Sequence, residues 1–473
     1  MQGNLRNIHA ASMKILEQTG VKLYNSEVLE IIKQNGIKVL NRTAYFTEDQ
    51  IMKWIKKAPS EFTIYARNPK YNMLIGGNHA EYNSTYGAPA VTESDGTTRP
   101  ALFNDYKTFL KIVHESDQFN INGGVLVQPT DLKSSESYPI MLLSTLVHSD
   151  KCIMGGPGGA KETQAVMDML GIVFGGKENL HKKPRILTIL NPSSPLQFDQ
   201  TTLDTMLIYA RHGQPMIIAP AVMAGTTGPV TLSGTIAQAS AESLAGIAIV
   251  QMIREGTPVI YGSASSTSDM RTGSFAIGAP EGALCTAYAA RLAKEYGLPS
   301  RGGGTLNDAK CVSVQSGYES MMSLLITRME GINYIFHGAG ILDNYASMSF
   351  EQLIVDIEII DMVERFMRGI KTDQESLAVD LINQVGPGGE FLTKEHTFKH
   401  CRNEAWSPEI GIRGSYPNEK ANEKIFANIE KKKEKLLSIY EKPEFSSDIQ
   451  SKLVDYLIDL GIASDKIKTA MEV

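Results

Sequence analysis

The sequence predicts an α/β fold: a (β/α)8 TIM barrel with a small mixed N-terminal cap and a C-terminal helical extension. Eight short apolar runs end on Gly, Ser, Pro or Asn, and a helix-length amphipathic segment follows each run. Their spacing of roughly 30 to 43 residues fits a strand plus a crossover helix, because parallel strands cannot be joined by a tight turn. In such a barrel the catalytic face lies at the C-terminal ends of the strands. The runs begin near Tyr82, Phe119, Lys151, Arg185, Gln214, Thr257, Ser300 and Ile332.

Three regions follow from this pattern: a cap over residues 1–80, the barrel over 81–371 and the extension over 372–473. In the cap we expect helices at 5–19, 26–35 and 47–58, the last with Thr47 as its N-cap, and then short strands after Pro59. The Asp95-Gly96 pair predicts a hairpin over 88–103, inserted after the first barrel strand at the rim of the pocket. Further helices are expected at 349–367, 372–384, 393–405 and 418–440, with a short helical tail over 446–473.

Composition narrows the class of protein. The 473 residues are 42% hydrophobic and 21% charged, and the net charge is -6. This balance gives no electrostatic footprint for nucleic acid. The four cysteines have no metal or disulfide spacing, the N-terminus has no apolar signal core, and Gly or Pro interrupts the longest apolar stretches. We therefore expect a cytoplasmic enzyme that does not enter a membrane and that forms a homo-oligomer, as most enzymes of this size do.

The sequence lacks the motifs of dinucleotide binding, phosphate binding, zinc binding and nucleophilic hydrolysis. The run GGPGGA at 155–160 lacks the spacing and the acidic partner of a dinucleotide loop, and GGGTLND at 302–308 has only Lys310 beside it to hold a phosphate. His396 and His400 have the i, i+4 spacing of metal ligands but no central Glu and no third ligand, which favours a role on the helix surface. No Gly-x-Ser-x-Gly elbow is present. We expect no metal and no catalytic nucleophile or acid.

Aromatic and amide side chains mark the predicted strand ends instead. A pocket of ring faces with few charges suits a quaternary ammonium cation, which has no N–H to donate and is held by cation–π attraction. The alternative is that the rings fill layers of the barrel interior. The candidate residues are Tyr82, Tyr86, Phe336, His337 and Tyr345, with Asn83, Gln128 and Asn307 beside them.

Several motifs in the same order resemble the trimethylamine methyltransferase superfamily of corrinoid-dependent methyltransferases. They are the run at 225–284 that begins GTTGPVTLSGTIAQAS, then GGGTLNDAK, GYESMMSLL and FHGAGILDN, and the tail motif VGPGGEFLTKEHTFKHCRNEAWSP at 385–408. The resemblance implies a barrel that docks a cobalamin-bearing corrinoid protein at its mouth and passes a methyl group from an amine to Co(I). The founding enzymes carry pyrrolysine, which the resemblance places near Asn344 and Tyr345. This chain has only the twenty ordinary residues, so it resembles the non-pyrrolysine branch, whose substrates are quaternary amines.

The resemblance leads to the hypothesis that glycine betaine donates the methyl group and leaves as dimethylglycine. Another betaine, such as proline betaine, carnitine or butyrobetaine, and a non-catalytic betaine-binding paralogue both stay open. In this hypothesis Tyr82, Tyr86, Phe336 and Tyr345 surround the ammonium. Asn83, Gln128, Asn307 and His337 are polar residues that orient the substrate, and Arg271 and Arg301 are the arginines nearest strand ends that could pair with its carboxylate. The corrinoid protein is expected to contact the loops at 224–229 and 266–275 and the tail at 386–406.

Overall fold

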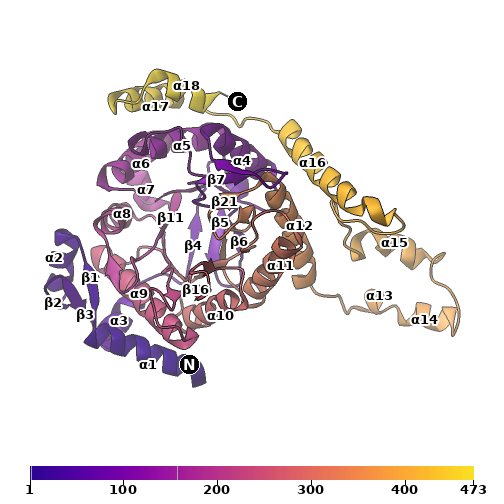
Figure 1. The fold of residues 1–473 in the computed structure, drawn as a ribbon, viewed down its shortest axis with the longest axis horizontal. Helices are drawn as coiled ribbons and strands as arrows, with labels where there is room; N and C mark the ends of the chain where they lie inside the picture. Colours follow the sequence, from indigo (N-terminus) through magenta and orange to yellow (C-terminus); the bar gives the residue numbers. More distant parts are fainter. Residues whose placement is uncertain (2, 157, 473) are drawn as a thin grey trace.

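The eight predicted runs form one closed parallel barrel in a computed structural model that describes residues 1–472 except 2 and 157 (Figure 1). The strands pair in the order β6-β19-β18-β15-β13-β11-β10-β9, and a parallel bridge from Tyr82 to Phe119 joins the two ends. The predicted TIM barrel is therefore confirmed. In chain order the strands are β6 (Glu81–Tyr82), β9 (Ile121–Gly123), β10 (Cys152–Met154), β11 (Ile186–Leu190), β13 (Met216–Ile218), β15 (Val259–Gly262), β18 (Ser300–Gly303) and β19 (Tyr334–Phe336).

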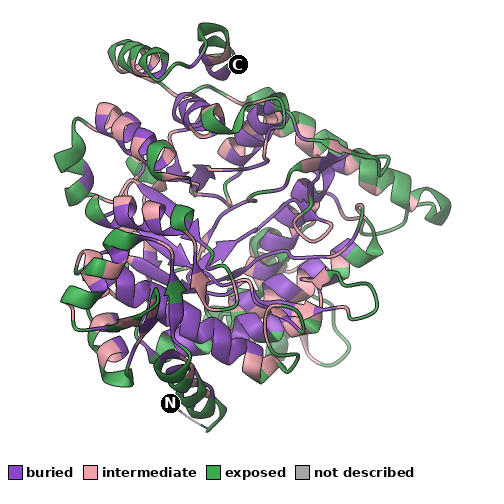
Figure 2. Cartoon of the chain, turned by 60° about the vertical axis from the view of Figure 1, so that its left-hand side comes forward, coloured by how far each residue is buried: buried purple, intermediate pink, exposed green. Residues whose placement is uncertain are grey.

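Helices surround the strands as a ring, with their buried faces turned toward the barrel (Figures 1 and 2). The 22-residue helix α9 is apolar all round, and by length and composition alone it could cross a membrane. In this structure 94% of its most apolar window is buried, so it is a core helix. The ring contains α4 (Phe103–Glu115), α5 (Ser134–His148), α6 (Ala160–Val173), α7 (Lys177–Lys182), α8 (Gln200–Arg211), α9 (Leu232–Ile253), α10 (Pro280–Glu295), α11 (Val314–Met329) and α12 (Phe350–Met367).

The N-terminal segment covers the outside of α9. Its helices α1 (Gly3–Gln18), α2 (Ser26–Gln34) and α3 (Glu48–Ile55) all contact α9, and its strands β1 (Val21–Leu23), β2 (Lys38–Leu40) and β3 (Thr43–Tyr45) form a small sheet with β12 (Gln197–Phe198). Thr47 is the N-cap of α3 and forms a capping box with Gln50, as the sequence predicts.

A hairpin closes the bottom of the barrel. Strands β4 (Glu61–Ile64) and β5 (Met73–Gly76) pair antiparallel, after which the chain enters the first barrel strand. Their buried side chains Phe62, Ile64, Met73 and Ile75 share one core cluster with the inward residues of the barrel strands. The pocket of the barrel is therefore open only toward the C-terminal ends of the strands, which we call the mouth.

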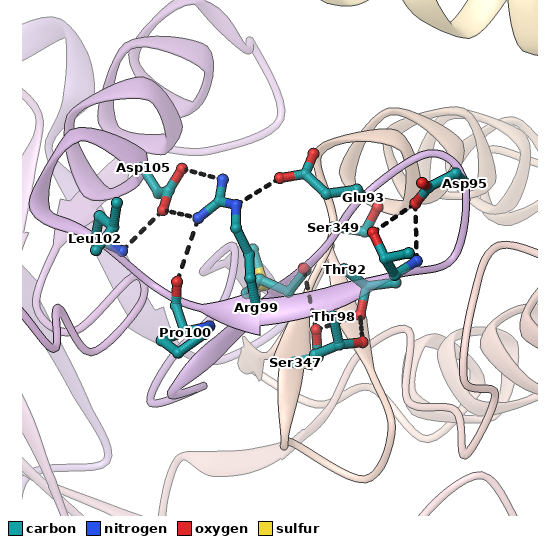
Figure 3. Close-up of polar contacts among 12 residues, drawn as sticks. Thr92, Glu93, Asp95, Thr98, Arg99, Pro100, Leu102, Asp105, Ser347 and Ser349 are labelled. Carbon is teal, nitrogen blue, oxygen red and sulfur yellow. Dashed lines mark hydrogen bonds and ion pairs between the residues drawn. The ribbon is translucent and has the colours of Figure 1, made fainter.

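A second sheet forms part of the rim of the mouth. The predicted hairpin is confirmed as β7 (Ala90–Thr92) and β8 (Thr98–Pro100), and β7 pairs with β21 (Ser347–Met348), which pairs with β20 (Ile341–Leu342). Thr92 Oγ1 lies 2.5 Å from Ser347 Oγ, and Arg99 lies between the carboxylates of Glu93 and Asp105 (Figure 3). The hairpin thus holds the turn that follows the last barrel strand.

The C-terminal extension begins with an arm that projects from the body on the right of Figure 1. The helix predicted at 372–384 is divided into α13 (Gln374–Leu377) and α14 (Val379–Val385) by Ala378, whose φ is 48°. The arm continues through α15 (Glu395–Glu404), and its end is held beside α12 because Arg365 contacts Glu404 and Glu358 accepts from the backbone N–H of Glu409. Helices α16 (Ala421–Ile439), α17 (Ser447–Asp459) and α18 (Ser464–Met471) then pack along the body.

The end of the arm is anchored on helix α12. Arg365 and Glu358 lie in the C-terminal half of α12, and that half is remote from the mouth because each barrel helix begins at the mouth and runs away from it. The end of the arm is therefore anchored away from the mouth, whereas the loops at 224–229 and 266–275 border the mouth. Contact of a corrinoid protein with these loops and with the tail at 386–406 stays a prediction.

Candidate active site at the barrel mouth

Four of the predicted aromatic residues lie together at the mouth. The ring of Tyr86 lies 5.2 Å from that of Phe336, His337 lies 4.6 Å from Phe336, and Tyr345 lies 4.6 Å from His337. Phe336 ends β19 and points into the barrel, where it belongs to the interior core cluster. The four rings make one continuous surface at the top of the barrel interior.

The backbone that carries these rings is strained. His337 has a φ of 56°, and three consecutive residues of the β20–β21 turn, Asp343, Asn344 and Tyr345, have φ values of 50°, 62° and 72°. A non-glycine residue in this left-handed region costs free energy, of order 1 to 3 kcal/mol, and such residues concentrate at functional sites. The rim sheet and the buried contacts of Tyr345 hold this turn in place.

Arg301 lies beneath the ring cluster as a buried cation. Its side chain starts on β18, is 1% exposed and forms no ion pair with any Asp or Glu among the described residues. Nη1 donates to the carbonyl of Ser263 over 2.6 Å, and the guanidinium lies 5.1 Å from the centre of the Phe336 ring. Burial lowers the pKa of Arg301 from its ordinary value, yet an arginine stays protonated at neutral pH.

His337 is a neutral acceptor for this arginine. Its Nε2 lies 3.0 Å from the carbonyl oxygen of Tyr86, which can only accept, so Nε2 carries the proton and Nδ1 accepts from Arg301 Nη2 over 3.4 Å. Burial, and then the charge of Arg301, lower the pKa of His337 to about 3. Both ring nitrogens are thus occupied by protein groups, and the geometry supports a role in orienting Arg301.

Unpartnered polar groups gather at the end of β6. The amide of Asn83 and the hydroxyls of Ser84 and Thr85 are fully buried and have no hydrogen-bond partner among the described residues. Buried polar groups are nearly always satisfied, so three in succession call for a functional explanation. Asn83, which the sequence predicts as a polar site residue, therefore lies where it could contact a bound ligand.

Gly155 and Gly156 make room for two tyrosines. A Cβ on Gly156 would lie 1.9 Å from Tyr138 Cε1, and one on Gly155 would lie 2.3 Å from the hydroxyl of Tyr209. Burial, and then the nearby Tyr138 and Tyr209, raise the pKa of Tyr86 well above its ordinary value. The sequence reasoning missed Tyr138 and Tyr209 because they come from the helices α5 and α8, and the paired glycines were the available signal.

Three predicted site residues lie outside the ring cluster. Tyr82 points outward, since its hydroxyl bonds to Glu364 on α12 beside Arg328, so its placement in an ammonium cage is corrected. Gln128 donates to Ser137 Oγ over 3.3 Å, and Asn307 donates to the carbonyl of Ile341 over 2.8 Å. These two amides brace loops of the mouth.

The other candidates for charge or metal binding lie apart from the site. Arg271 is on an exposed loop and pairs with Asp269. His396 donates to the carbonyl of Glu375, and His400 lies 3.4 Å from the carboxylate of the same residue, so both anchor the arm. Among the described residues no group of three or more His, Cys, Asp or Glu side chains could hold a metal.

These features describe a (β/α)8 barrel whose mouth brings together aromatic rings, amides and one buried arginine. Comparison with known proteins then identifies the family. The family model "Trimethylamine methyltransferase (MTTB)" matches residues 2–459. The chain therefore belongs to the trimethylamine methyltransferase family, a family of corrinoid-dependent methyltransferases.

Relatives and solved structures agree with this assignment. The glycine betaine methyltransferase of Desulfitobacterium hafniense (strain Y51) is 40% identical over 463 residues, which cover 97% of this chain and 96% of the relative. The trimethylamine methyltransferase of Methanosarcina barkeri is 31% identical over 404 residues, which cover 83% and 81%. The crystal structure of the Methanosarcina barkeri monomethylamine methyltransferase aligns with a TM-score of 0.54 at 11% identity, covering 92% of this chain and 86% of that one. This last likeness shows the fold alone.

The assigned tautomer of His337 yields a test by nitrogen-15 NMR of histidine-labelled protein. We expect its signals to show a neutral ring with the proton on Nε2 from pH 8 down to pH 5, because burial and Arg301 both oppose protonation. His337→Gln assigns the signal. A titration of that signal with a midpoint between pH 6 and 7 would contradict the arrangement.

Proposed function

We propose that this protein transfers a methyl group from glycine betaine to the Co(I) of a corrinoid protein and releases dimethylglycine. The observation that carries the proposal is the continuous ring surface that Tyr86, Phe336 and Tyr345 form through His337. The amide of Asn83, which is unpartnered among the described residues, follows β6, the strand that pairs with the strand of Phe336. The glycine betaine methyltransferase relative, which aligns with nearly the whole chain, supports the choice of substrate.

Methyl transfer from a quaternary ammonium needs no general acid or base. When the N–CH3 bond of a quaternary ammonium breaks, its electron pair stays on nitrogen and the leaving group is already a neutral amine. The corrinoid supplies a Co(I) nucleophile whose electron pair forms the new bond to the methyl carbon. The chain must then hold one methyl group in line with the mouth and exclude water, and the buried rings and amides of the site suit both tasks.

Neutral rings are also the appropriate partners for the ammonium. The substrate cation loses its charge as the methyl group leaves, so a carboxylate beside it would stabilise the substrate more than the transition state and would slow transfer. Cation–π attraction is weaker and still orients the cation. Phe336 and Tyr86 provide two ring faces in contact with each other.

The dimensions of the mouth support a corrinoid that is carried by a partner. The cavity beside Arg301 and Tyr345 measures about 10 Å³, room for about one water molecule and far less than a corrin ring occupies. Around it lies a set of exposed apolar residues at the starts of α9 and α11 and in the loop between β16 (Ser266–Ser268) and β17 (Phe275–Ala276). This mouth patch consists of Val230, Met270, Val314 and Tyr318, which are 60% to 85% exposed.

The mouth patch fits a protein interface better than a solvent surface. Gly225 brings two of its members together, because a Cβ there would lie 3.0 Å from Met270 Sδ and 3.6 Å from a methyl group of Val230. Exposed apolar patches of this kind mark sites of association. A corrinoid protein seated on the patch would present its cofactor to the pocket beneath.

A transfer assay tests the proposal directly. Purified protein, a reduced corrinoid protein of the same organism and glycine betaine should give methylated corrinoid and dimethylglycine in equal amounts. Transfer from carnitine or proline betaine, without transfer from glycine betaine, would identify that compound as the substrate. Tight betaine binding by calorimetry without transfer to any corrinoid would instead identify a binding protein.

The ring surface makes a prediction for substrate affinity. Tyr86→Leu and Phe336→Leu should each weaken betaine binding by about 0.5 to 2 kcal/mol through the lost cation–π attraction. Tyr82→Leu is the matched control, since Tyr82 points away from the interior: it should lower the melting temperature and leave betaine affinity unchanged. Equal losses of affinity in all three variants would mean that the rings only fill the barrel.

The mouth patch makes a prediction for the partner. Met270→Glu and Val314→Glu should raise KM for the corrinoid protein by roughly 5- to 30-fold, which corresponds to about 1 to 2 kcal/mol at an interface centre. Turnover with free cob(I)alamin should stay as in the wild type. The control is Leu40→Glu, an exposed apolar residue of the cap. An unchanged KM for the corrinoid protein in both patch variants would place the docking surface elsewhere.

A further inference from the structure

Arg301 is a buried positive charge for which the described chain offers no negative partner. Its neighbours are a carbonyl, a neutral imidazole and the face of Phe336. Burying an ion without a counter-ion is costly, and proteins retain such a group where a ligand completes it. The guanidinium is moreover fixed from three sides, so its orientation is set before any ligand arrives.

Two donors beside each other remain without an acceptor. Arg301 Nε and the hydroxyl of Tyr345 are both buried and have no hydrogen-bond partner among the described residues. The two side chains are neighbours, because both contact His337 and both line the cavity at the mouth. An N–H and an O–H that converge on one space fit the two oxygens of a carboxylate.

The same cationic group would repel a bare quaternary ammonium. Phe336 has the guanidinium 5.1 Å from its ring centre and the Tyr86 ring 5.2 Å away, so the charge lies only one ring from the proposed ammonium site. A ligand that brings its own anion between the two cations removes the repulsion. A short spacer suits this geometry, as in glycine betaine, where one carbon separates the nitrogen from the carboxylate.

We propose that Arg301, with Tyr345, binds the carboxylate of the substrate and thereby selects betaines over quaternary amines that lack a carboxylate. The proposal rests on the proposed methyl-transfer function and adds its specificity-determining residues. His337 is a positioning residue in this scheme, since it holds Nη2 of Arg301. Choline, which has a hydroxyl in place of the carboxylate, is the informative competitor.

The test compares glycine betaine with choline by calorimetry and by kcat and KM in the transfer assay, for the wild type, Arg301→Gln and Tyr345→Phe. A lost hydrogen bond to a charged group corresponds to about 10- to 150-fold in affinity. Arg301→Gln should therefore weaken betaine binding by that factor and leave choline binding equal or stronger, with most of the change in KM. Tyr345→Phe should cause a smaller loss in the same direction. Arg291→Gln is the control, since Arg291 is exposed and pairs with Glu330 on the outer helices.

Each outcome of the test either supports or overturns the role of Arg301 and Tyr345 in carboxylate binding. If both variants keep the wild-type ratio of betaine to choline affinity, the inference is overturned. If Arg301→Gln does not fold, Tyr345→Phe and the wild type still decide, because wild-type protein that binds choline as tightly as betaine contradicts it. Absence of methyl transfer in the wild type would contradict the proposed function instead. The ratio of betaine to choline affinity measured by calorimetry would still test the inference independently of transfer.

Discussion

The mouth of the barrel holds one positive charge, Arg301, among rings, amides and carbonyls, and no described carboxylate pairs with it. A site with this composition discriminates by the charge of its ligand, because Arg301 repels a second cation and a simple anion gains no cation–π attraction from the rings. A zwitterion can pair its anion with Arg301 and place its cation against the rings. Burial, and then the charge of Arg301, lower the pKa of His337 and keep its ring neutral.

Much of the surrounding structure serves to hold this arrangement. The floor hairpin β4–β5 closes the far end of the barrel, so that ligands can enter only at the mouth. The rim sheet, fixed by Thr92, Ser347 and the Arg99 cluster, supports a turn in which three non-glycine residues keep positive φ values. That strain is balanced by the burial of Tyr345, which places its hydroxyl next to the guanidinium. The rim is thus a structural requirement of the site and also part of its wall.

The sequence predicted the barrel well and the site in part, and particular residues show why. Strand and helix periods repeat eight times, so the fold follows from local patterns. Tyr82 was wrongly expected in the pocket because β6 has only two residues, and an error of one position turns a side chain to the other face. Tyr138 and Tyr209 were missed because these helix residues approach the strand ends beside Gly155 and Gly156, which follow β10, and such long-range contacts are not visible in a local sequence pattern. Arg301 was recognised as a candidate, but its burial without a counter-ion depends on the whole fold.

The most direct measurement of this account is a crystal structure of the protein with glycine betaine bound. The account predicts the carboxylate within hydrogen-bond distance of Arg301 Nε and the Tyr345 hydroxyl, the trimethylammonium group against Tyr86 and Phe336, and one methyl group directed toward the mouth patch. Betaine bound with its ammonium away from these rings, or with its carboxylate away from both Arg301 and Tyr345, would contradict it.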